Sequence, residues 1–375
     1  MKIFRNILSA TLIFLCLFCS CSGGIDSGGS APQEKEGIEK EAENPYEDEE
    51  EDETGDDEKE DSEIEKIESV GGISEKIPPA PVFLYCKTVS EKEIVFGFSQ
   101  PVLLISLDLK PDLEYEKIEE GSEIKIKLVE NPEPGLSVNA DLLAKDKHGN
   151  TVNKQLSFRT RNNRVPKMQI NELRTEYSND SQRAEFIEFK MLSDGNLYAI
   201  RVFVAGNYKN PLLYEFASVE VKAEDYVVLH LRNLGALGKD EYGESLDESG
   251  GKDSSPTARD FWISGSNKLL HKTDAVYVMD QDDNVLDAVM IAEKPDPLWG
   301  KDYFSNAAEF LFSKGAWKSP AEKVCSPADA VDSSGIKTAT TKSISRNEGA
   351  KNTHTKADWY VTAASGVTPG LPNKL

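Results

Sequence analysis

The sequence predicts an all-β fold, with two β-sandwich domains that follow a signal peptide and a disordered acidic linker. Runs of alternating apolar and polar residues recur after residue 78 and are separated by turns of Pro, Gly and Asn. No long amphipathic helix pattern is present in the same region. A stretch with almost no residues to bury precedes it. We divide the chain into the segments 1–20, 21–77, 78–162 and 166–375.

Residues 1–20 have the layout of a secretory signal peptide. Lys2 and Arg5 precede an apolar run at 7–18, which is shorter than the stretch of about 20 apolar residues that spans a bilayer. Small and polar residues follow Cys21, without a positive stop-transfer cluster. We therefore expect cleavage of this segment rather than a transmembrane anchor.

The cleavage site Phe18-Cys19-Ser20-Cys21 resembles a bacterial lipobox, in the relaxed form of spirochaetes. Phe18 replaces the usual Leu, and Cys19 replaces the usual small residue. The resemblance implies a lipid on Cys21 and a place in the bacterial cell envelope. It leaves open whether the protein is periplasmic or exposed at the surface. Secretion after another cleavage is the alternative.

The negative charge is concentrated in the linker. Residues 34–68 contain 20 Asp or Glu and 4 Lys, which accounts for −16 of the formal charge of −23. Setting aside also the two cations of the signal peptide leaves −9 on the rest of the chain. This remainder argues against nonspecific binding of nucleic acid. The linker itself is expected to act as a spacer, because like charges repel and extend the chain.

The cysteines predict no disulfide framework. Cys86 and Cys325 are the ones that remain beside Cys21 after cleavage, and they fall in separate predicted domains. Each is interpreted as a small buried hydrophobe rather than a catalytic thiol.

The segment 78–162 is predicted to form a sandwich of short strands. Its clearest strands are 93–99, 123–128 and 156–160. The stretches Val89–Val102 and Ala144–Val152 resemble bacterial Ig-like domains of cell-surface proteins. His148 and Gly149 need no more than a hairpin turn with Gly at positive φ.

The segment 166–375 has period-two or fully buried strand patterns at six places. They are 168–173, 185–191, 198–204, 226–231, 275–279 and 285–291.

The order of these strands resembles the lamin tail domain, an Ig-type sandwich of nuclear lamins and of many secreted bacterial proteins. An opening Ile170-Asn-Glu-Leu leads into Glu185-Phe-Ile-Glu-Phe, and the hairpin 274–289 follows. The C-terminal motifs of the resemblance are Ser345-Arg346, Asp358-Trp359 and Thr368–Asn373. The resemblance implies a non-catalytic module. Bacterial lamin tail domains also occur joined to secreted nucleases and hydrolases, where they serve as tethers for the enzyme.

Two insertions depart from a minimal lamin tail, at 235–260 and 299–337. Long loops on a rigid sandwich often carry binding specificity, although unstructured surface decoration is the alternative. Trp299 and Trp317 lie in the second insertion near Gly and Pro. Exposed together, they could stack on a sugar or anchor a protein partner, and packing beneath the loop is the competing interpretation.

Oxygen-rich segments are interpreted as structural. Residues 280–284 supply alternate oxygen ligands of the kind that Ca²⁺ prefers, but they lack the Gly and Glu of an EF-hand and fit a β-turn. Glu172, Glu185 and Glu188 could form paired carboxylates for glycoside hydrolysis. The alternation in 185–191 instead places Glu188 and Lys190 on a solvated face.

Motifs for catalysis are absent from the sequence. The four His residues are far apart, no zinc spacing or phosphate loop is present, and 263–267 lacks the Gly-x-Ser-x-Gly elbow of a serine hydrolase. We therefore expect no catalytic, cofactor-binding or metal-binding residues. The predicted function is a lipid-anchored display module for an unidentified protein, glycan or envelope ligand, with a secreted hydrolase or nuclease, or its tethering accessory, as the alternative.

Overall fold

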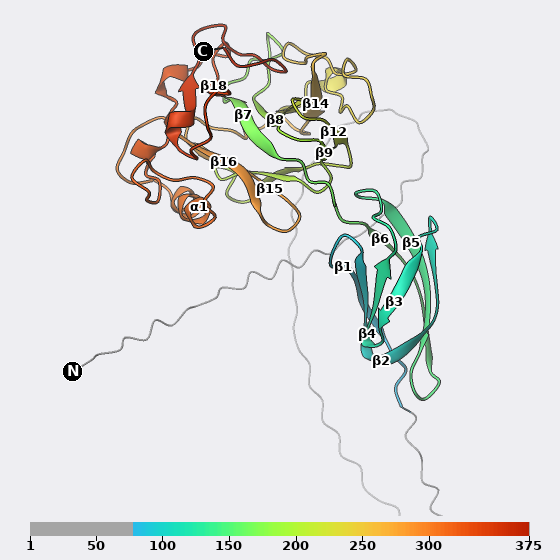
Figure 1. Ribbon diagram of the computed structural model, residues 1–375. Coiled ribbons are helices and arrows are strands. Elements are labelled where there is room, and N and C mark those ends of the chain that lie inside the picture. Colours follow the sequence, from blue (N-terminus) through green and yellow to red (C-terminus); the bar gives the residue numbers. More distant parts are fainter. Residues whose placement is uncertain (1–77, 375) are drawn as a thin grey trace, which may run out of the picture. The chain divides into compact units, whose positions relative to one another are not determined.

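The computed structural model describes residues 78–374 and confirms the all-β class (Figure 1). The predicted signal peptide, the lipidation at Cys21 and the acidic linker lie outside the described residues. No helix within 78–374 combines the length and the apolar character needed to cross a membrane. We describe residues 78–162 as the first module and residues 166–374 as the second module.

The first module is an antiparallel arrangement of six strands. They are β1 Phe83–Thr88, β2 Glu93–Lys110, β3 Tyr115–Glu119, β4 Gly121–Leu128, β5 Ser137–Lys145 and β6 Thr151–Arg159. The strand order is β3-β4-β2-β5-β6, and β1 also pairs with β2. The long strand β2 pairs with β1 and β4 in its first half and with β5 in its second half. Its register shifts between Gly97 and Val102, so β2 joins two halves that share one core.

Strand β5 shows why the first module folds as the pattern predicts. Val138, Ala140, Leu142 and Ala144 are buried and alternate with residues that point outward. Because successive side chains on a strand face opposite sides, one face supplies the core and the other meets solvent.

The second module contains two larger sheets and a short strand pair. One sheet has the order β14-β13-β8-β7-β18-β19, the other has the order β11-β10-β15-β16-β17, and β12 pairs with β9. The first of these sheets comprises β7 Met168–Arg174, β8 Phe186–Met191, β13 Tyr226–His230, β14 Ala258–Trp262, β18 Ile344–Arg346 and β19 Trp359–Val361. The second comprises β10 Arg201–Val204, β11 Leu212–Glu215, β15 Asp274–Met279, β16 Val285–Ala292 and β17 Val331–Asp332. The pair is β9 Gly195–Asn196 with β12 Glu220–Val221.

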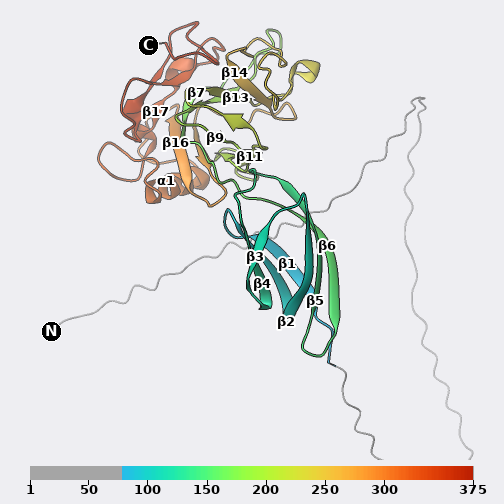
Figure 2. The ribbon, with the colours of Figure 1, turned by 45° about the vertical axis from the view of Figure 1, so that its right-hand side comes forward.

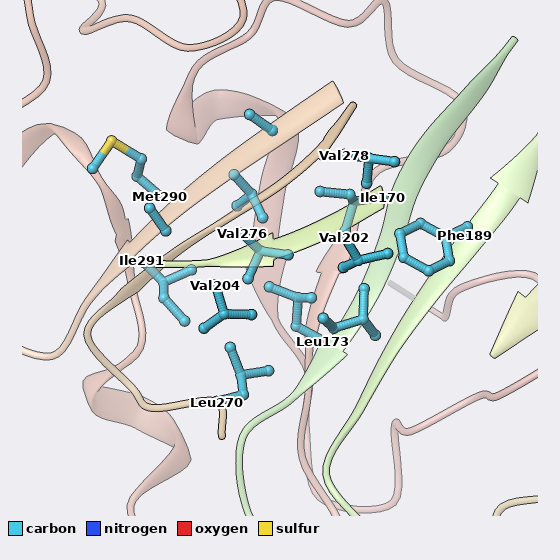
Figure 3. Close-up of a cluster of buried hydrophobic side chains, with 14 of the residues drawn as sticks. Ile170, Leu173, Phe189, Val202, Val204, Leu270, Val276, Val278, Met290 and Ile291 are labelled. Carbon is cyan, nitrogen blue, oxygen red and sulfur yellow. The ribbon is translucent and has the colours of Figure 1, made fainter. Parts of the chain in front are cut away.

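Apolar side chains from both sheets form one core. Figure 3 shows Ile170, Leu173 and Phe189 of the six-stranded sheet near Val202 and Val276 of the five-stranded sheet. All five are fully buried. Burial of such side chains is worth roughly 1.5–3 kcal/mol each relative to exposure, which makes this core the main stabilising element of the module.

The six strand patterns predicted for this module are all present, with one shifted start. The strand predicted at 198–204 begins at Arg201, because Ala199 adopts a positive φ of 58° and Tyr198 lies in the preceding turn. The short strands β9, β11, β12, β14, β17, β18 and β19 were not predicted. Two of them, β14 and β17, pair in parallel with β13 and β16.

Both insertions fold onto the sheets instead of forming unstructured decoration. The first contains the 3₁₀ turn Gly235–Leu237 and runs into β14. The second contains the helix α1 Asp302–Ser313, which the sequence pattern did not predict, and the 3₁₀ turns Pro327–Asp329 and Ser334–Ile336. The helix α1 lies next to β16 in both views (Figures 1 and 2) and contacts β15 and β16, and its buried residues recur at helical spacing. They are Phe304, Ala307, Ala308 and Leu311.

Candidate functional site

The paired carboxylates Glu172 and Glu188 lie opposite each other on β7 and β8, and both are fully buried. A β-bulge between Ile170 and Glu172 makes this arrangement. The extra residue turns both Asn171 and Glu172 to the outer face, while Ile170 and Leu173 enter the core. The predicted opening motif Ile170-Asn-Glu-Leu is therefore a bulged strand.

The C-terminal segment covers these carboxylates. Thr368 donates its backbone N–H to Glu172 Oε2 at 3.1 Å, and Gly370 donates its N–H to Glu188 Oε2 at 2.6 Å. Asn171 Nδ2 donates to Glu188 Oε1 at 2.8 Å. Asn373 Nδ2 donates to the carbonyl of Asn171 at 3.1 Å. The opening and closing motifs, far apart in sequence, therefore meet on one face of the sheet.

The expectation that Glu188 and Lys190 occupy a solvated face is wrong for Glu188. Its carboxyl is covered by Gly370, and burial, together with the charge of Glu172, raises its pKa well above the ordinary value. Lys190 is partly buried and forms ion pairs with Glu348 at 2.7 Å and Glu224 at 3.0 Å. The alternation correctly identified the outer face, but it could not show that another segment covers that face.

Glu185 does not join this pair. It precedes β8 and forms an ion pair with Arg232, whose Nε and Nη2 each lie 3.1 Å from a carboxylate oxygen. Of the three carboxylates considered for hydrolysis, only Glu172 and Glu188 thus lie together. The C-terminal segment covers both of them.

The proposed aromatic pair of the second insertion is not on the surface. Trp317 is fully buried in the core of the second module. Trp299 is partly buried, packs against the same core and donates its Nε1–H to the carbonyl of Cys325 at 2.8 Å. The interpretation as an exposed aromatic pair is therefore wrong for Trp317, whereas Trp299 packs beneath the insertion and keeps part of its surface accessible.

The segment 280–284 forms the turn between β15 and β16. Asp280 Oδ1 accepts the backbone N–H groups of Asp282 and Asn284 at 2.8 and 3.0 Å. Its carboxylate therefore points into the turn. Residues 146–150 of the first module form the matching turn, in which Asp146 accepts from His148 and Asn150. Gly149 has a φ of 87°, as the hairpin interpretation predicted.

Other residues singled out in the sequence are held by structural contacts. His230 is buried, lies 2.6 Å from Asp260 through Nε2 and stacks on Trp262. Cys325 is buried and Cys86 partly buried, and burial raises the pKa of each thiol to about 12. Within residues 78–374, no cluster of three or more His, Cys, Asp or Glu is arranged to hold a metal ion.

The first insertion forms one wall of a surface groove in the second module. This insertion groove has a volume of about 690 Å³ and is lined by residues of and near the β9–β12 pair and by the insertion next to β14. Its lining residues are Asn196, Ser218, Val219, Glu220, Lys222, Asp225, Tyr242, Gly243, Glu244 and Arg259.

Tyr242 is the exposed aromatic residue of the groove, with 53% of its surface accessible. The edge of its ring packs against Phe261, with the ring centroids 5.6 Å apart. Its hydroxyl donates to Asp240 at 2.8 Å. Burial, followed by this hydrogen bond, raises its pKa above the ordinary value. Tyr242 is therefore held in a fixed position and presents ring surface to solvent.

Arg259 fixes the shape of the loop beside Tyr242. Its Nη1 donates to the carbonyls of Glu241 and Gly243 at 2.6 and 2.7 Å. Glu241 in turn accepts the backbone N–H groups of Asp260 and Ser249 at 2.8 and 3.0 Å. The insertion is thus anchored through polar contacts to its own backbone.

The groove carries charges of both signs. Lys222 and Arg259 face three acids, of which Glu220 is already paired with Arg164 at 2.8 Å. Asp225 accepts the backbone N–H of Lys222 at 2.8 Å. The formal charges nearly cancel, so the groove favours polar ligands without a strong preference for cations or anions.

A smaller aromatic hollow of about 270 Å³ lies beside α1. Tyr208, which is 58% exposed, stacks on Tyr303 with 5.0 Å between ring centroids. Tyr277 stacks on Phe203 at the same centroid distance. Sequence reasoning missed this surface. The outward positions of β10 and β15 could have indicated it, because aromatic residues occupy them on both strands.

Comparisons with known proteins give a family but no activity. The family model TP_1001_2nd, described as a protein second domain, matches residues 166–361. An uncharacterized protein of Treponema pallidum (strain Nichols) is 26% identical over 227 residues, which covers 58% of this chain. The chain spans 56% of the length of that relative.

A DUF4876 family protein from Bacteroides thetaiotaomicron has a crystal structure that is similar over 56% of this chain and 77% of that chain, with 14% sequence identity. Its TM-score of 0.21 is too low to establish shared topology. The family model, in contrast, matches more than half of the residues of this protein, with its match beginning just before β7. The chain belongs to the TP_1001 second-domain family.

Proposed function

We propose that this protein is a lipid-anchored binding protein of the bacterial cell envelope, whose insertion groove contacts a neutral polysaccharide. The lipobox-like residues before Cys21 and the acidic spacer support the anchor. The resemblances to Ig-like and lamin tail domains support a non-catalytic display role.

We infer the class of ligand from one observation, the fixed ring of Tyr242 in a polar groove of nearly balanced charge. A sugar ring presents a face of C–H groups and a rim of hydroxyls, which together require an apolar surface beside hydrogen-bonding groups. Lys222, Glu244 and Arg259 line the same groove and carry such groups. The groove opens to solvent, which suits a polymer better than a small enclosed metabolite.

The hydrolase alternative receives less support. Its best carboxylate pair, Glu172 and Glu188, accepts hydrogen bonds from Thr368 and Gly370 and has no room for a sugar beside it in this arrangement. Hydrolysis by two carboxylates requires substrate between them.

The ligand is tested by a glycan array with the mature full-length chain, followed by titration calorimetry on any hit. Tyr242→Ala should weaken binding by about tenfold or more, which corresponds to roughly 1.4 kcal/mol for a buried aromatic contact. Tyr208→Ala is the matched control, because Tyr208 is similarly exposed but lies in the aromatic hollow. Equal affinity of the Tyr242 variant and the native chain would refute the groove as the site.

The anchor is tested by metabolic palmitate labelling of native protein and Cys21→Ala, with protease treatment of intact and permeabilised cells. Label that depends on Cys21 supports the lipoprotein, and absence of label contradicts it. Loss of the protein from intact cells indicates surface exposure. Protection until permeabilisation indicates the periplasmic face and directs the search to envelope polysaccharides.

A further inference from the structure

The C-terminal strap, defined as residues 363–374, crosses the outer face of β7 and β8 without forming a strand or helix. Three acids of the module each accept one of its backbone N–H groups. Thr368 donates to Glu172, Gly370 donates to Glu188, and Asn373 donates to Glu348 at 2.8 Å.

Apolar contacts of the strap are few. Val367 packs against a small cluster that includes Phe186 and Tyr226. Leu371 is largely exposed. The remaining attachments are polar, such as the hydrogen bond at 2.7 Å from Thr257 Oγ1 to the carbonyl of Gly370. Because little apolar area holds the strap, its closure depends on the state of the acids beneath it.

No unpaired cation lies next to Glu172 and Glu188 beneath the strap among the described residues. Glu172 and Glu188 are direct cross-strand neighbours, and like charges at such positions repel. Arg174 on β7 attracts Glu172, but its guanidinium is already paired with Asp253. Lys190 on β8 is engaged by Glu348 and Glu224. The other titratable groups on this face are Tyr226 and His230 of β13, Asp260 of β14, which lies 2.6 Å from His230, and Tyr360 of β19.

We propose that the strap is a pH-sensitive closure, which stays on the sheet while Glu172 and Glu188 retain one proton between them and detaches when both ionise. Detachment would return the two carboxylates to water, where both charges are tolerated. Glu348 keeps its charge throughout and acts as a fixed acceptor for Asn373.

The directions of the pKa shifts agree with this arrangement. Burial raises the pKa of Glu188 well above its ordinary value, and the charge of Glu172 raises it further. Burial also raises the pKa of Glu172, although Ser343 and Thr368 oppose the change by hydrogen bonding. For Glu348, burial acts to raise the pKa, but hydrogen bonds from Lys190, Asn373 and Asn171 together with the charge of Lys190 outweigh it, so its pKa is lowered.

The sign of the pH dependence follows from linkage. The closed form binds more protons than the open form between the ordinary Glu pKa of about 4.3 and the raised pKa of Glu188. The contribution to closure is therefore complete below the ordinary value and is lost as pH rises through the raised value.

Hydrogen exchange of the full-length chain, followed by mass spectrometry from pH 5 to pH 9, tests the proposal. After correction for the chemical exchange rate, opening of the strap amides should increase by up to about tenfold per pH unit, as expected for release of one proton. The amides of β5 in the first module serve as an internal reference, because no buried acid lies on that strand.

Glu188→Gln is the decisive variant. Its amide oxygen still accepts from Gly370. The Asn171 amide, which donates to Glu188 Oε1 in the native chain, must turn over so that its Oδ1 accepts from the new amide N–H. Opening in this variant should no longer depend on pH. Glu220→Gln, at the insertion groove, should keep the native dependence.

Two results would overturn the proposal. One is strap protection in the native chain that does not change with pH, and the other is an unchanged pH dependence in Glu188→Gln. Should that variant fold poorly, Glu172→Gln removes the charge that adds to the raised pKa of Glu188, while burial still raises it. Opening of the strap must then level off at a lower pH than in the native chain.

Discussion

The two modules use the same kind of strand in different surroundings. On β5 of the first module, buried and outward positions alternate, and the outward ones meet solvent. On β7 and β8 of the second module, nearly every residue is buried, including the outward Glu172 and Glu188. The comparison teaches that alternation assigns a residue to a face of the sheet, whereas the rest of the fold decides whether that face is exposed to solvent.

The covered face is held by polar contacts because its residues are polar. On this face Arg174 is buried against Asp253 of the first insertion, and between the two sheets Arg346 of β18 is buried against Asp287 of β16 at 2.5 Å. A buried charge without a partner is costly, so each of these side chains needs its counterpart in place. The first module has no buried ion pair of this kind among its described residues; its Lys110–Asp108 pair is exposed.

The largest expected effect comes from breaking a buried ion pair. Arg346→Ala leaves Asp287 buried without its cation and removes the packing on Trp359, so it should lower the free energy of unfolding of the second module by about 3–5 kcal/mol. All four Trp residues lie in this module, so urea unfolding followed by Trp fluorescence reports on it alone.

The matched control is Lys110→Ala in the first module. Because both partners of its ion pair are mostly exposed, we expect a change of about 0–1 kcal/mol, measured by hydrogen exchange of β2 and β5. Similar losses for both variants would show that burial of the pair does not distinguish the modules.

An intermediate effect is expected at outward strand positions. Glu172→Ala removes the acceptor of Ser343, Ser345 and Thr368, and the unpaired donors should cost about 1–3 kcal/mol in urea unfolding of the second module. Asp141→Ala, at an outward and exposed position of β5, should stay within about 0.5 kcal/mol. A stable Glu172 variant would contradict the role of this carboxylate in holding the strap.

The smallest effect should be the same in both modules, because the hairpin turns are built alike. Asp146→Ala and Asp280→Ala each remove a carboxylate that accepts two backbone N–H groups of its own turn. Each should lower the free energy of unfolding of its module by about 1 kcal/mol. A much larger loss of unfolding free energy for Asp280→Ala would indicate that this turn has a role beyond its own hydrogen bonds.

Much of this fold could be predicted because it depends on local patterns. The strands of residues 93–99, 123–128 and 285–291 have apolar residues at strand spacing, and each lies within an observed strand. The predicted turns at 146–150 and 280–284 are also local, since one Asp side chain satisfies the backbone of each turn. Short strands such as β17 and β18 have too few residues to show a period.

The candidate site was less predictable, because its parts come from distant segments. The insertion at 235–260 was singled out from the sequence, but the groove that it lines also requires β9 and β12, which have two residues each. For Trp299 and Trp317 the sequence left exposure and packing beneath the loop both open, because nothing in it shows that α1 and its flanking turns fold inward.

The sequence by itself determined the all-β class, the location of the main strands and the chemistry of the turns, because hydrophobic periodicity and side-chain to backbone hydrogen bonds act over a few residues. Tertiary structure decided which polar residues are buried. The C-terminal strap reaches Glu172 across almost two hundred residues of sequence, and only the folded chain brings its N–H groups to that carboxylate. Burial and the nearest charges depend on such contacts, and they set the ionisation of the pair.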